Sequence, residues 1–336
     1  MKVTPHTIPG LLLLASSAMW SNDVIAADTP QALVLEREIP LEHVSGRIDH
    51  MAIDLGRRHL AVAELGNDTV DLIDLDSSRV IYRIDVLDEP QGIVFVANSD
   101  LFAVADGGDG SVRLFKGSDL SPAGIIDLGD DADNVRVDRS AGHVVVGYGD
   151  GGLAIIDPVT HSKLADIALR AHPEGFQLSG DGSRAFVNVP DAREVASVDL
   201  RSGQQVAAWK MTGSRSNFPM AIDESGQTLA IAFRNPPRLA LLDAQHGTVT
   251  ADVETCGDSD DVFFDDRRAR IYVSCGAGVV DVFEHGDGAL RRIARVKTSS
   301  GARTSLFVPE LDRLFVAARS ALLGDDAKIM VFRPSP

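Results

Sequence analysis

Seven short polar segments hold most of the side chains in this sequence that could bind or react. They combine histidine, carboxylate, amide and arginine groups, and they recur as RIDH (47–50), EPQG (89–92), DADN (131–134), HPEG (172–175), SNFP (216–219), DSDD (258–261) and GART (301–304). Groups of this kind that converge on one cavity are what a site for a cation or a polar ligand requires. Ordinary turns are rich in polar residues too, which is the plainer interpretation of the pattern.

The candidate ligand-binding residues all come from these segments. They are Arg47, Asp49, His50, Gln91, Asp133, Asn134, His172, Glu174, Asn217, Asp260, Asp261 and Arg303. Four of them are also candidate metal ligands, because histidine with carboxylates suits zinc and carboxylates with carbonyls suit calcium: His50, His172, Asp260 and Asp261. The sequence has no HExxH or CxxC spacing, so the ligands of a divalent cation would have to converge from separate segments.

Hydrolysis is the catalytic alternative. Four candidates could supply acid, base and oxyanion groups to a lactonase-like reaction: His50, His172, Glu174 and Arg303. No GxSxG nucleophile motif is present. His50 and Asp49 are adjacent in the chain, so in a strand their side chains would diverge and make no obvious dyad. No catalytic residue is therefore assigned.

An apolar run follows each polar segment and sets the period of the chain. The first runs end at Asp54, Val96, Asp138, Ser179, Asp223, Asp265 and Val308, so the copies lie 42, 42, 41, 44, 42 and 43 residues apart. Further short runs of β-branched, alternating residues, separated by polar turns, complete each copy and indicate strands. Seven copies with a period of about 42 residues predict an all-β, seven-bladed propeller of four-stranded blades.

The predicted domains follow from this period. Residues 28–336 form a single propeller, with blade cores near 46–88, 89–130, 131–171, 172–215, 216–257, 258–300 and 301–333. The last copy lacks a fourth run, and the alternating segment 32–39, ALVLEREI, could supply it and close the ring. The alternative for that segment is a disordered leader.

A propeller brings the seven polar segments together. The loop that enters each innermost strand and the loop after the second strand lie on the same face, so all seven segments should meet at one mouth of the channel. The second loops add further groups there: Glu64, Asp106, Tyr148, Arg234, Cys275 and Arg319. Cys256 and Cys275, the two cysteines, should meet at this rim and form a disulfide; two free thiols are the alternative.

The segment GNDTVDLIDL in the first copy resembles the YVTN-type repeat of YncE-like seven-bladed propellers. The stretches GRIDHMAID, CGDSDDVFFD and YVSCGAG also resemble a subgroup of exported YncE-like proteins. The resemblance implies a periplasmic or surface propeller, often of unassigned role, and it implies no catalytic residues. It alone suggests a further alternative, an accessory protein of an exported redox enzyme.

The N-terminus and the charge set the expected location and partners. Lys2, an apolar run within 8–20 and small residues up to Ala27 predict a signal peptide at 1–27, with an uncleaved anchor as the alternative. The protein is then periplasmic in a Gram-negative source, with no membrane span after cleavage. A formal charge of −17 disfavours nucleic acid as a partner. Cations or basic protein surfaces fit such a charge, which could also serve solubility alone.

These observations favour a monomeric, exported, non-catalytic binding module or scaffold. Its ligand at the channel mouth would be a small polar molecule, a cation or a periplasmic protein partner.

Overall fold

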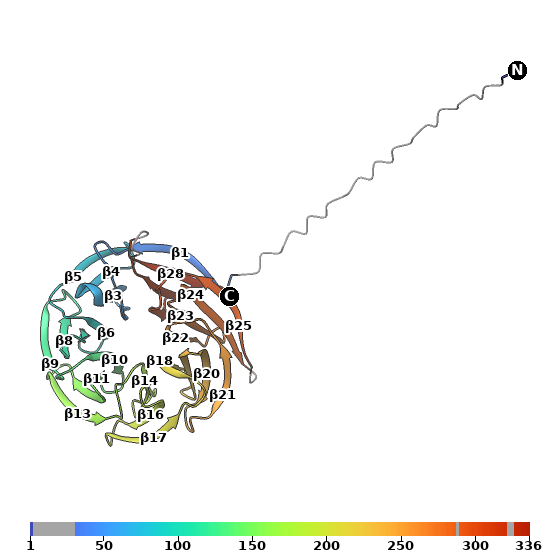
Figure 1. Cartoon of the computed structure of the whole chain (residues 1–336). Helices are drawn as coiled ribbons and strands as arrows, with labels where there is room; N and C mark the ends of the chain where they lie inside the picture. The colour runs from blue at the N-terminus through green and yellow to red at the C-terminus, as the bar shows by residue number, and fades with distance from the viewer. Residues whose placement is uncertain (3–30, 287–288, 321–325) are drawn as a thin grey trace. The chain divides into compact units, whose positions relative to one another are not determined.

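The computed structural model describes residues 1–2, 31–286, 289–320 and 326–336. Gln31–Pro336 forms one compact unit. Its described residues build seven four-stranded antiparallel sheets, which stand as blades around a ring (Figure 1). The predicted all-β, seven-bladed propeller is confirmed.

Each blade runs from the centre of the ring outward in four strands. The innermost strands are β2 (Met51–Asp54), β6 (Pro90–Val96), β10 (Ala132–Asp138), β14 (Phe176–Leu178), β18 (Arg215–Ile222), β22 (Ser259–Asp265) and β26 (Ser305–Val308). The second strands are β3 (His59–Glu64), β7 (Leu101–Asp106), β11 (His143–Tyr148), β15 (Arg184–Val189), β19 (Thr228–Asn235), β23 (Arg270–Cys275) and β27 (Arg313–Ala318). We call the end of the ring at which the innermost strands begin the mouth.

The outer half of each blade completes the sheet. The third strands are β4 (Thr69–Asp74), β8 (Ser111–Lys116), β12 (Gly152–Asp157), β16 (Glu194–Asp199), β20 (Pro237–Asp243), β24 (Val279–Gly286) and β28 (Lys328–Pro334). The fourth strands are β5 (Arg79–Ile84), β9 (Pro122–Asp127), β13 (Ser162–Ala168), β17 (Gln204–Lys210), β21 (Val249–Glu254), β25 (Ala289–Lys297) and, in the seventh blade, β1 (Leu33–Pro40). A short 3₁₀ helix, η1 (Leu65–Asn67), links β3 and β4.

The N-terminal strand closes the ring, as the sequence predicts. β1 pairs antiparallel with β28, from Leu33 opposite Pro334 to Pro40 opposite Lys328. The last blade is thus built from both ends of the described unit, and the outer edge of β28 is paired rather than open.

The core lies between the blades. Within the described residues, buried apolar side chains form seven clusters, and each cluster joins two neighbouring blades around the ring. The second strands are covered on both faces, so all six residues of β7 are buried. The fourth strands face solvent on one side, so β17 alternates between exposed and half-buried residues. This difference explains why the second runs of the repeat are continuously apolar.

The third strands also bury carboxylates, which outer strands neutralise. Asp71 is fully buried and accepts hydrogen bonds from Arg83 Nε and Nη2, both at 2.6 Å. Asp281 occupies the same place in the sixth blade, where Arg295 Nε donates to it at 2.6 Å. A buried carboxylate needs such partners, because burial of an unpaired charge is costly.

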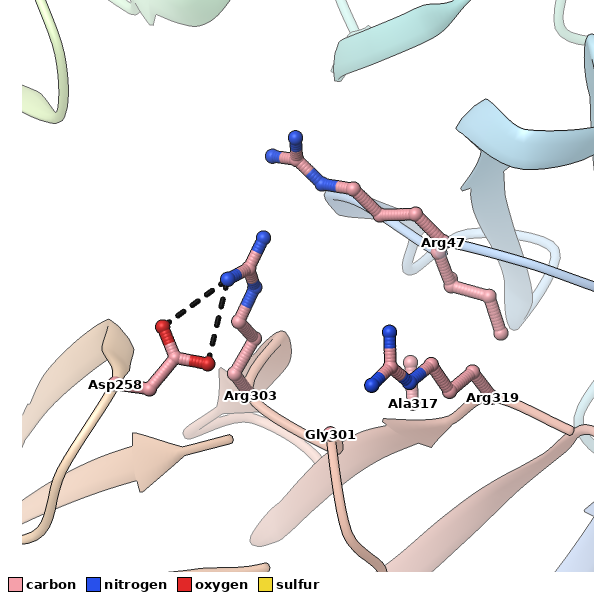
Figure 2. A pocket seen from close by; sticks show the side chains of 7 residues that line it. Arg47, Asp258, Gly301, Arg303, Ala317 and Arg319 are labelled. Carbon is pink, nitrogen blue, oxygen red and sulfur yellow. Dashed lines mark hydrogen bonds and ion pairs between the residues drawn. The ribbon is translucent and has the colours of Figure 1, made fainter. Parts of the chain in front are cut away.

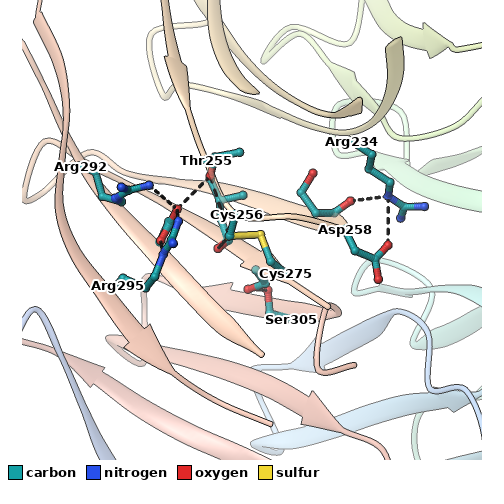
Figure 3. The surroundings of a disulfide bond; sticks show 12 residues. Arg234, Thr255, Cys256, Asp258, Cys275, Arg292, Arg295 and Ser305 are labelled. Atoms are coloured by element: carbon teal, nitrogen blue, oxygen red, sulfur yellow. Dashed lines mark hydrogen bonds and ion pairs between the residues drawn. A yellow bond between two sulfur atoms is a disulfide. The ribbon is translucent and has the colours of Figure 1, made fainter. Parts of the chain in front are cut away.

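The predicted disulfide is present. Cys256 follows β21 and Cys275 ends β23, and the bond between them joins the fifth and sixth blades beside the mouth (Figure 3). Both half-cystines are buried. The bond fixes the segment that carries Asp258 into β22.

The predicted signal peptide at 1–27 falls almost entirely outside the residues that the structure describes. Among the residues that are described, none forms a helix long and apolar enough to cross a membrane.

Candidate functional site

Irregular pairing of the innermost strands directs polar side chains into the mouth. Between β10 and β11 the register passes from Ala132 to Val135, which leaves Asp133 and Asn134 out of the ladder. Between β22 and β23 the register skips Asp260 in the same way. Extra residues in a β-bulge bend the strand and re-aim their side chains. The polar segments at 131–134 and 258–261 are therefore placed by bulges, which the repeat pattern alone does not reveal.

A glycine allows two innermost strands to approach each other at the mouth. The Gly175 N–H donates to the Phe218 carbonyl at 3.0 Å, and a Cβ at position 175 would lie 2.5 Å from that oxygen. Only glycine permits this contact. The contact sets Glu174, the preceding residue, at the edge of a small cavity.

This small cavity, of about 30 Å³, is the acidic half of the site. Its polar lining consists of Arg47, Asp49, His50, Asp133, Asn134, Glu174 and Asp260. The volume is enough for about one water-sized group. Burial and the nearby Asp133 carboxylate raise the pKa of Glu174 to about 8, so this side chain is largely protonated at neutral pH.

His172 is held as a cation beside this cavity. Its Nδ1 lies 2.7 Å from the Gly149 carbonyl, which can only accept, so Nδ1 carries a proton. Its Nε2 lies 3.7 Å from Asp133 Oδ2. The Asp133 carboxylate, with the Gly149 carbonyl, raises the pKa of His172 to about 9. The imidazole is thus positively charged at neutral pH, with the Gly149 carbonyl beside Nδ1 and the Asp133 carboxylate beside Nε2.

His50 lies among carboxylates in the lining of the small cavity. Its Nδ1 is 4.0 Å from Asp261 Oδ1, and Asp261 Oδ2 accepts the Ser305 N–H at 2.7 Å. Burial alone would lower the pKa of His50, but Asp49, Asp261 and Asp133 outweigh burial and raise it. Burial raises the pKa of Asp261 to about 7 and that of Asp49 to about 6.

An ion-pair network borders the other half of the mouth. Asp260 accepts from Arg234 Nη2 and lies 2.9 Å from Arg303 Nε. Arg303 Nη1 also donates to both oxygens of Asp258, at 3.1 and 3.4 Å. Arg234 stacks over the Phe218 ring at 4.0 Å and lies 3.5 Å from Asp258 (Figure 3). These contacts hold both guanidinium groups in defined positions.

A second, larger cavity of about 140 Å³ is lined by arginines. Its walls are Arg47, Ile48, Asp258, Gly301, Arg303, Ala317 and Arg319 (Figure 2). Arg47 lines both cavities, so the acidic and the arginine-lined halves adjoin. Arg47 Nη2 is 2.9 Å from Asp49 Oδ2, which fixes this shared side chain.

The comparisons with known proteins support the propeller fold and show no specific function. No protein-family profile matches the chain, and no curated protein matches it at significant similarity. A chain of Kuenenia stuttgartiensis hydrazine synthase superposes with a TM-score of 0.76 and 14% identity, covering 87% of this chain and 98% of that one. A chain of a mitotic checkpoint complex superposes with a TM-score of 0.74 and 14% identity, covering 98% and 99%. At such identity these similarities show a shared seven-bladed propeller fold, and the YncE-like assignment stays a prediction.

Most of the sequence-predicted residues meet at the mouth. Those that line one or both cavities are Arg47, Asp49, His50, Asp133, Asn134, Glu174, Asp260 and Arg303. His172 and Asp261 stand directly behind them, through their contacts with Asp133 and His50.

Two candidates have structural contacts instead. Asn217 is buried, and its amide donates to Asn188 Oδ1 at 2.9 Å and to the Glu194 carbonyl at 3.1 Å. Gln91 donates to Asp131 Oδ1 at 3.0 Å, and neither cavity includes it. Both side chains join neighbouring segments rather than line the cavities.

Three arginines at the mouth lie outside the twelve ligand-binding candidates that the sequence predicts. Arg234 lies near the end of β19 and Arg319 directly follows β27, and the repeat predicts both positions on the mouth face. Arg136 lies within β10, at a position of the repeat that looks like ordinary strand. Burial lowers the pKa of Arg136, and the Asp261 and Asp133 carboxylates oppose that effect.

The four predicted metal ligands do not form a cluster. Across the described residues, no three or more His, Cys, Asp or Glu side chains are grouped as a metal ion would need. His172 is engaged by Gly149 and Asp133, and Asp260 by two arginines. These contacts would have to break before the residues could bind a divalent cation.

Proposed function

We propose that this protein is a non-catalytic binding module that takes up a small polar molecule at the mouth of the propeller. One observation carries the proposal: several blades deliver charged side chains to two adjoining cavities that share Arg47. The charged groups fix one another through ion pairs, so the site is formed before a ligand arrives. Pre-organised polar groups around a concave site are typical of small-molecule binding.

The hydrolase alternative receives little support from the geometry. A general base must have a lone pair to accept a proton, yet His172 carries a proton on Nδ1 and its pKa is raised to about 9. Glu174, with a pKa of about 8, is mostly protonated at neutral pH and could donate rather than accept. A lactone panel tests this alternative directly: turnover that is lost in His172→Ala would favour it over binding alone.

The proposal also includes export to an oxidising compartment and a protein partner. The described disulfide suits an oxidising compartment such as the periplasm. The propeller of the mitotic checkpoint complex belongs to an assembly, so a protein partner is a second occupant to test at the same face. No described residue specifically supports the alternative of an accessory protein for a redox enzyme.

A thermal-shift panel tests the proposed function. Carboxylates, phosphates, amines, amino acids, sugars and divalent cations would be added separately to the purified full-chain protein. We expect at least one small polar compound to raise the Tm in proportion to its occupancy. Glu174→Gln, at the mouth, should reduce the shift, whereas Glu284→Gln, on a peripheral strand, should not. A panel with no shift, or a shift equal in both variants, would refute binding at the mouth.

A further inference from the structure

We propose that the arginine-lined cavity is a binding site for a small oxyanion, a compound with a carboxylate or a phosphate group. Three arginine side chains, of Arg47, Arg303 and Arg319, line this one space (Figure 2). This inference rests on the proposed function and names the chemical class of its ligand.

The charge of the lining favours an anion. Three arginines face the cavity against a single carboxylate, Asp258, which leaves an excess of two positive charges in the lining. Asp258 is itself engaged by Arg303 Nη1 at 3.1 Å. Asp49 pairs with Arg47 and Asp260 with Arg303, which offsets that excess. Arg234 pairs with both Asp258 and Asp260, so the four arginines and three carboxylates together keep one net positive charge. Because the chain as a whole carries −17, a positive hollow is an exception on its surface.

Arg319 supplies the unengaged guanidinium of the three. It is exposed, and within the described residues no hydrogen bond or ion pair involves its side chain. Arg47 and Arg303, in contrast, are already fixed by Asp49, Asp258 and Asp260. The guanidinium group of Arg319 therefore keeps N–H donors that an incoming oxyanion could use, beside the two guanidinium groups that are already paired.

The backbone at Gly301 makes room for this arrangement. Gly301 has a positive φ of 81°, and a Cβ there would lie 2.3 Å from Arg319 Nε and 2.7 Å from Arg319 Nη2. Any larger residue would push the guanidinium away from the cavity wall. The Gly301 N–H donates to the Gly276 carbonyl at 2.8 Å, which ties this turn to the disulfide-bonded sixth blade.

The size and shape of the cavity select a small group. A volume of about 140 Å³ equals roughly five water molecules. Guanidinium forks match the planar carboxylate and the phosphate in two parallel hydrogen bonds, which a sugar hydroxyl or an amine does not offer. The site therefore takes an oxyanion, either as a whole small molecule or as the acidic end of one.

Calorimetric titration of the full-chain protein with succinate, and separately with inorganic phosphate, tests the inference. We expect saturable binding of at least one probe, with a Kd of about 1 mM or tighter. The stronger probe tells a carboxylate site from a phosphate site. Arg319→Gln should weaken binding about tenfold or more, and Arg319→Lys, which keeps the charge but loses the fork, should weaken it less. Arg58→Gln is the matched control, because Arg58 is an exposed arginine in the β2–β3 turn at the opposite end of the ring.

The outcomes separate the two proposals. No saturable binding of either probe, or equal weakening by Arg319→Gln and Arg58→Gln, would overturn the oxyanion site. If an amine or a neutral compound then bound in the thermal-shift panel and lost its effect in Glu174→Gln, the proposed function would stand without the oxyanion. Unchanged melting curves for Arg319→Gln and Arg319→Lys would show that weakened binding does not come from misfolding.

Discussion

Buried charges in this propeller are stabilised by specific partners rather than by solvent. Asp281 is the clearest case: Arg295 donates to both of its oxygens at 2.6 and 2.8 Å, and Arg292 and Thr255 approach it at 3.2 and 3.3 Å (Figure 3). The arginine stems cover the carboxylate while their head groups stay partly in water.

Replacing Asp281 with asparagine should therefore destabilise the fold. Loss of the charge leaves the hydrogen bonds weakened and the arginines without their counter-ion, which should cost about 1–3 kcal/mol in the free energy of unfolding. Asp252→Asn is the control, since Asp252 forms an exposed pair with Arg238 and should contribute less than about 1 kcal/mol. Equal denaturation midpoints for the two variants would contradict this role of the buried carboxylate.

Only some of the side chains at the mouth could be predicted from the repeat. Arg47, Asp49 and Glu174 could be found because they lie in the polar segments that precede the apolar runs of the repeat. Asn217 lies in the corresponding polar segment of the fifth copy, yet its amide is buried against Asn188 and Glu194. Asn217 is paired with Phe233 in the ladder, and the bulge between β18 and β19 begins after it. In β10 and β22 the unpaired bulge residues are Asp133, Asn134 and Asp260 themselves. A bulge changes side-chain direction without changing the spacing, so the sequence could not reveal it.

At the scale of elements, the closing strand carries two side chains, Leu33 and Ile39, into the core. Ile39 on β1 is fully buried in the cluster that joins the seventh and first blades. Leu35, on the same strand, is 42% exposed. The two positions therefore separate core packing from strand propensity.

Ile39→Ala should lower the free energy of unfolding by about 2–4 kcal/mol through lost burial and a residual cavity. Leu35→Ala should change it by less than about 0.5 kcal/mol. Urea denaturation of both variants measures the difference. Similar losses in the two would mean that β1 is not the strand that closes the ring in solution.

The disulfide stabilises the connection between two blades. Cys256 and Cys275 are 19 residues apart, so the bond should contribute about 3 kcal/mol by restricting the unfolded chain. The double variant Cys256→Ser/Cys275→Ser should melt at lower temperature, and wild type in reductant should approach it. Intact mass should rise by about two daltons on reduction and denaturation, as two S–H groups form. An unchanged mass would show that the bond is absent.

The charged side chains at the mouth come from elements that are far apart in the sequence. The repeat predicted that the innermost strands begin on one face, because every blade has the same strand order. It could not predict which side chains pair there, since the contact of Arg303 with Asp260 depends on the bulge that leaves Asp260 out of the ladder. The fold was thus predictable from periodicity, and the pairing required three-dimensional structure.

For the whole molecule, several acidic groups hold protons more tightly when the protein is folded. Burial raises the pKa of Asp49 to about 6, of Asp261 and Asp106 to about 7, and of Glu174 and Glu64 to about 8. The pKa of His172 is raised to about 9 by Asp133 and Gly149. The folded protein binds more protons than the unfolded chain wherever the pH lies between the ordinary and the raised values.

Stability should therefore fall as the pH rises from about 5 to about 9. A raised folded-state pKa gives stability that is complete below the unfolded pKa and is lost as the pH climbs through the folded value. Glu174→Gln removes one of these groups, so its Tm should depend less steeply on pH between about 5 and 8. Melting curves across this range measure both effects. A wild-type Tm that rises over the same interval would contradict the assignment of protonated carboxyls.

The most direct test of the binding account is a crystal structure of the protein soaked with succinate or phosphate. The account predicts electron density for the oxyanion between the guanidinium groups of Arg47, Arg303 and Arg319, and its loss in Arg319→Gln. An empty mouth at saturating ligand, or density only on the outer strands, would contradict it.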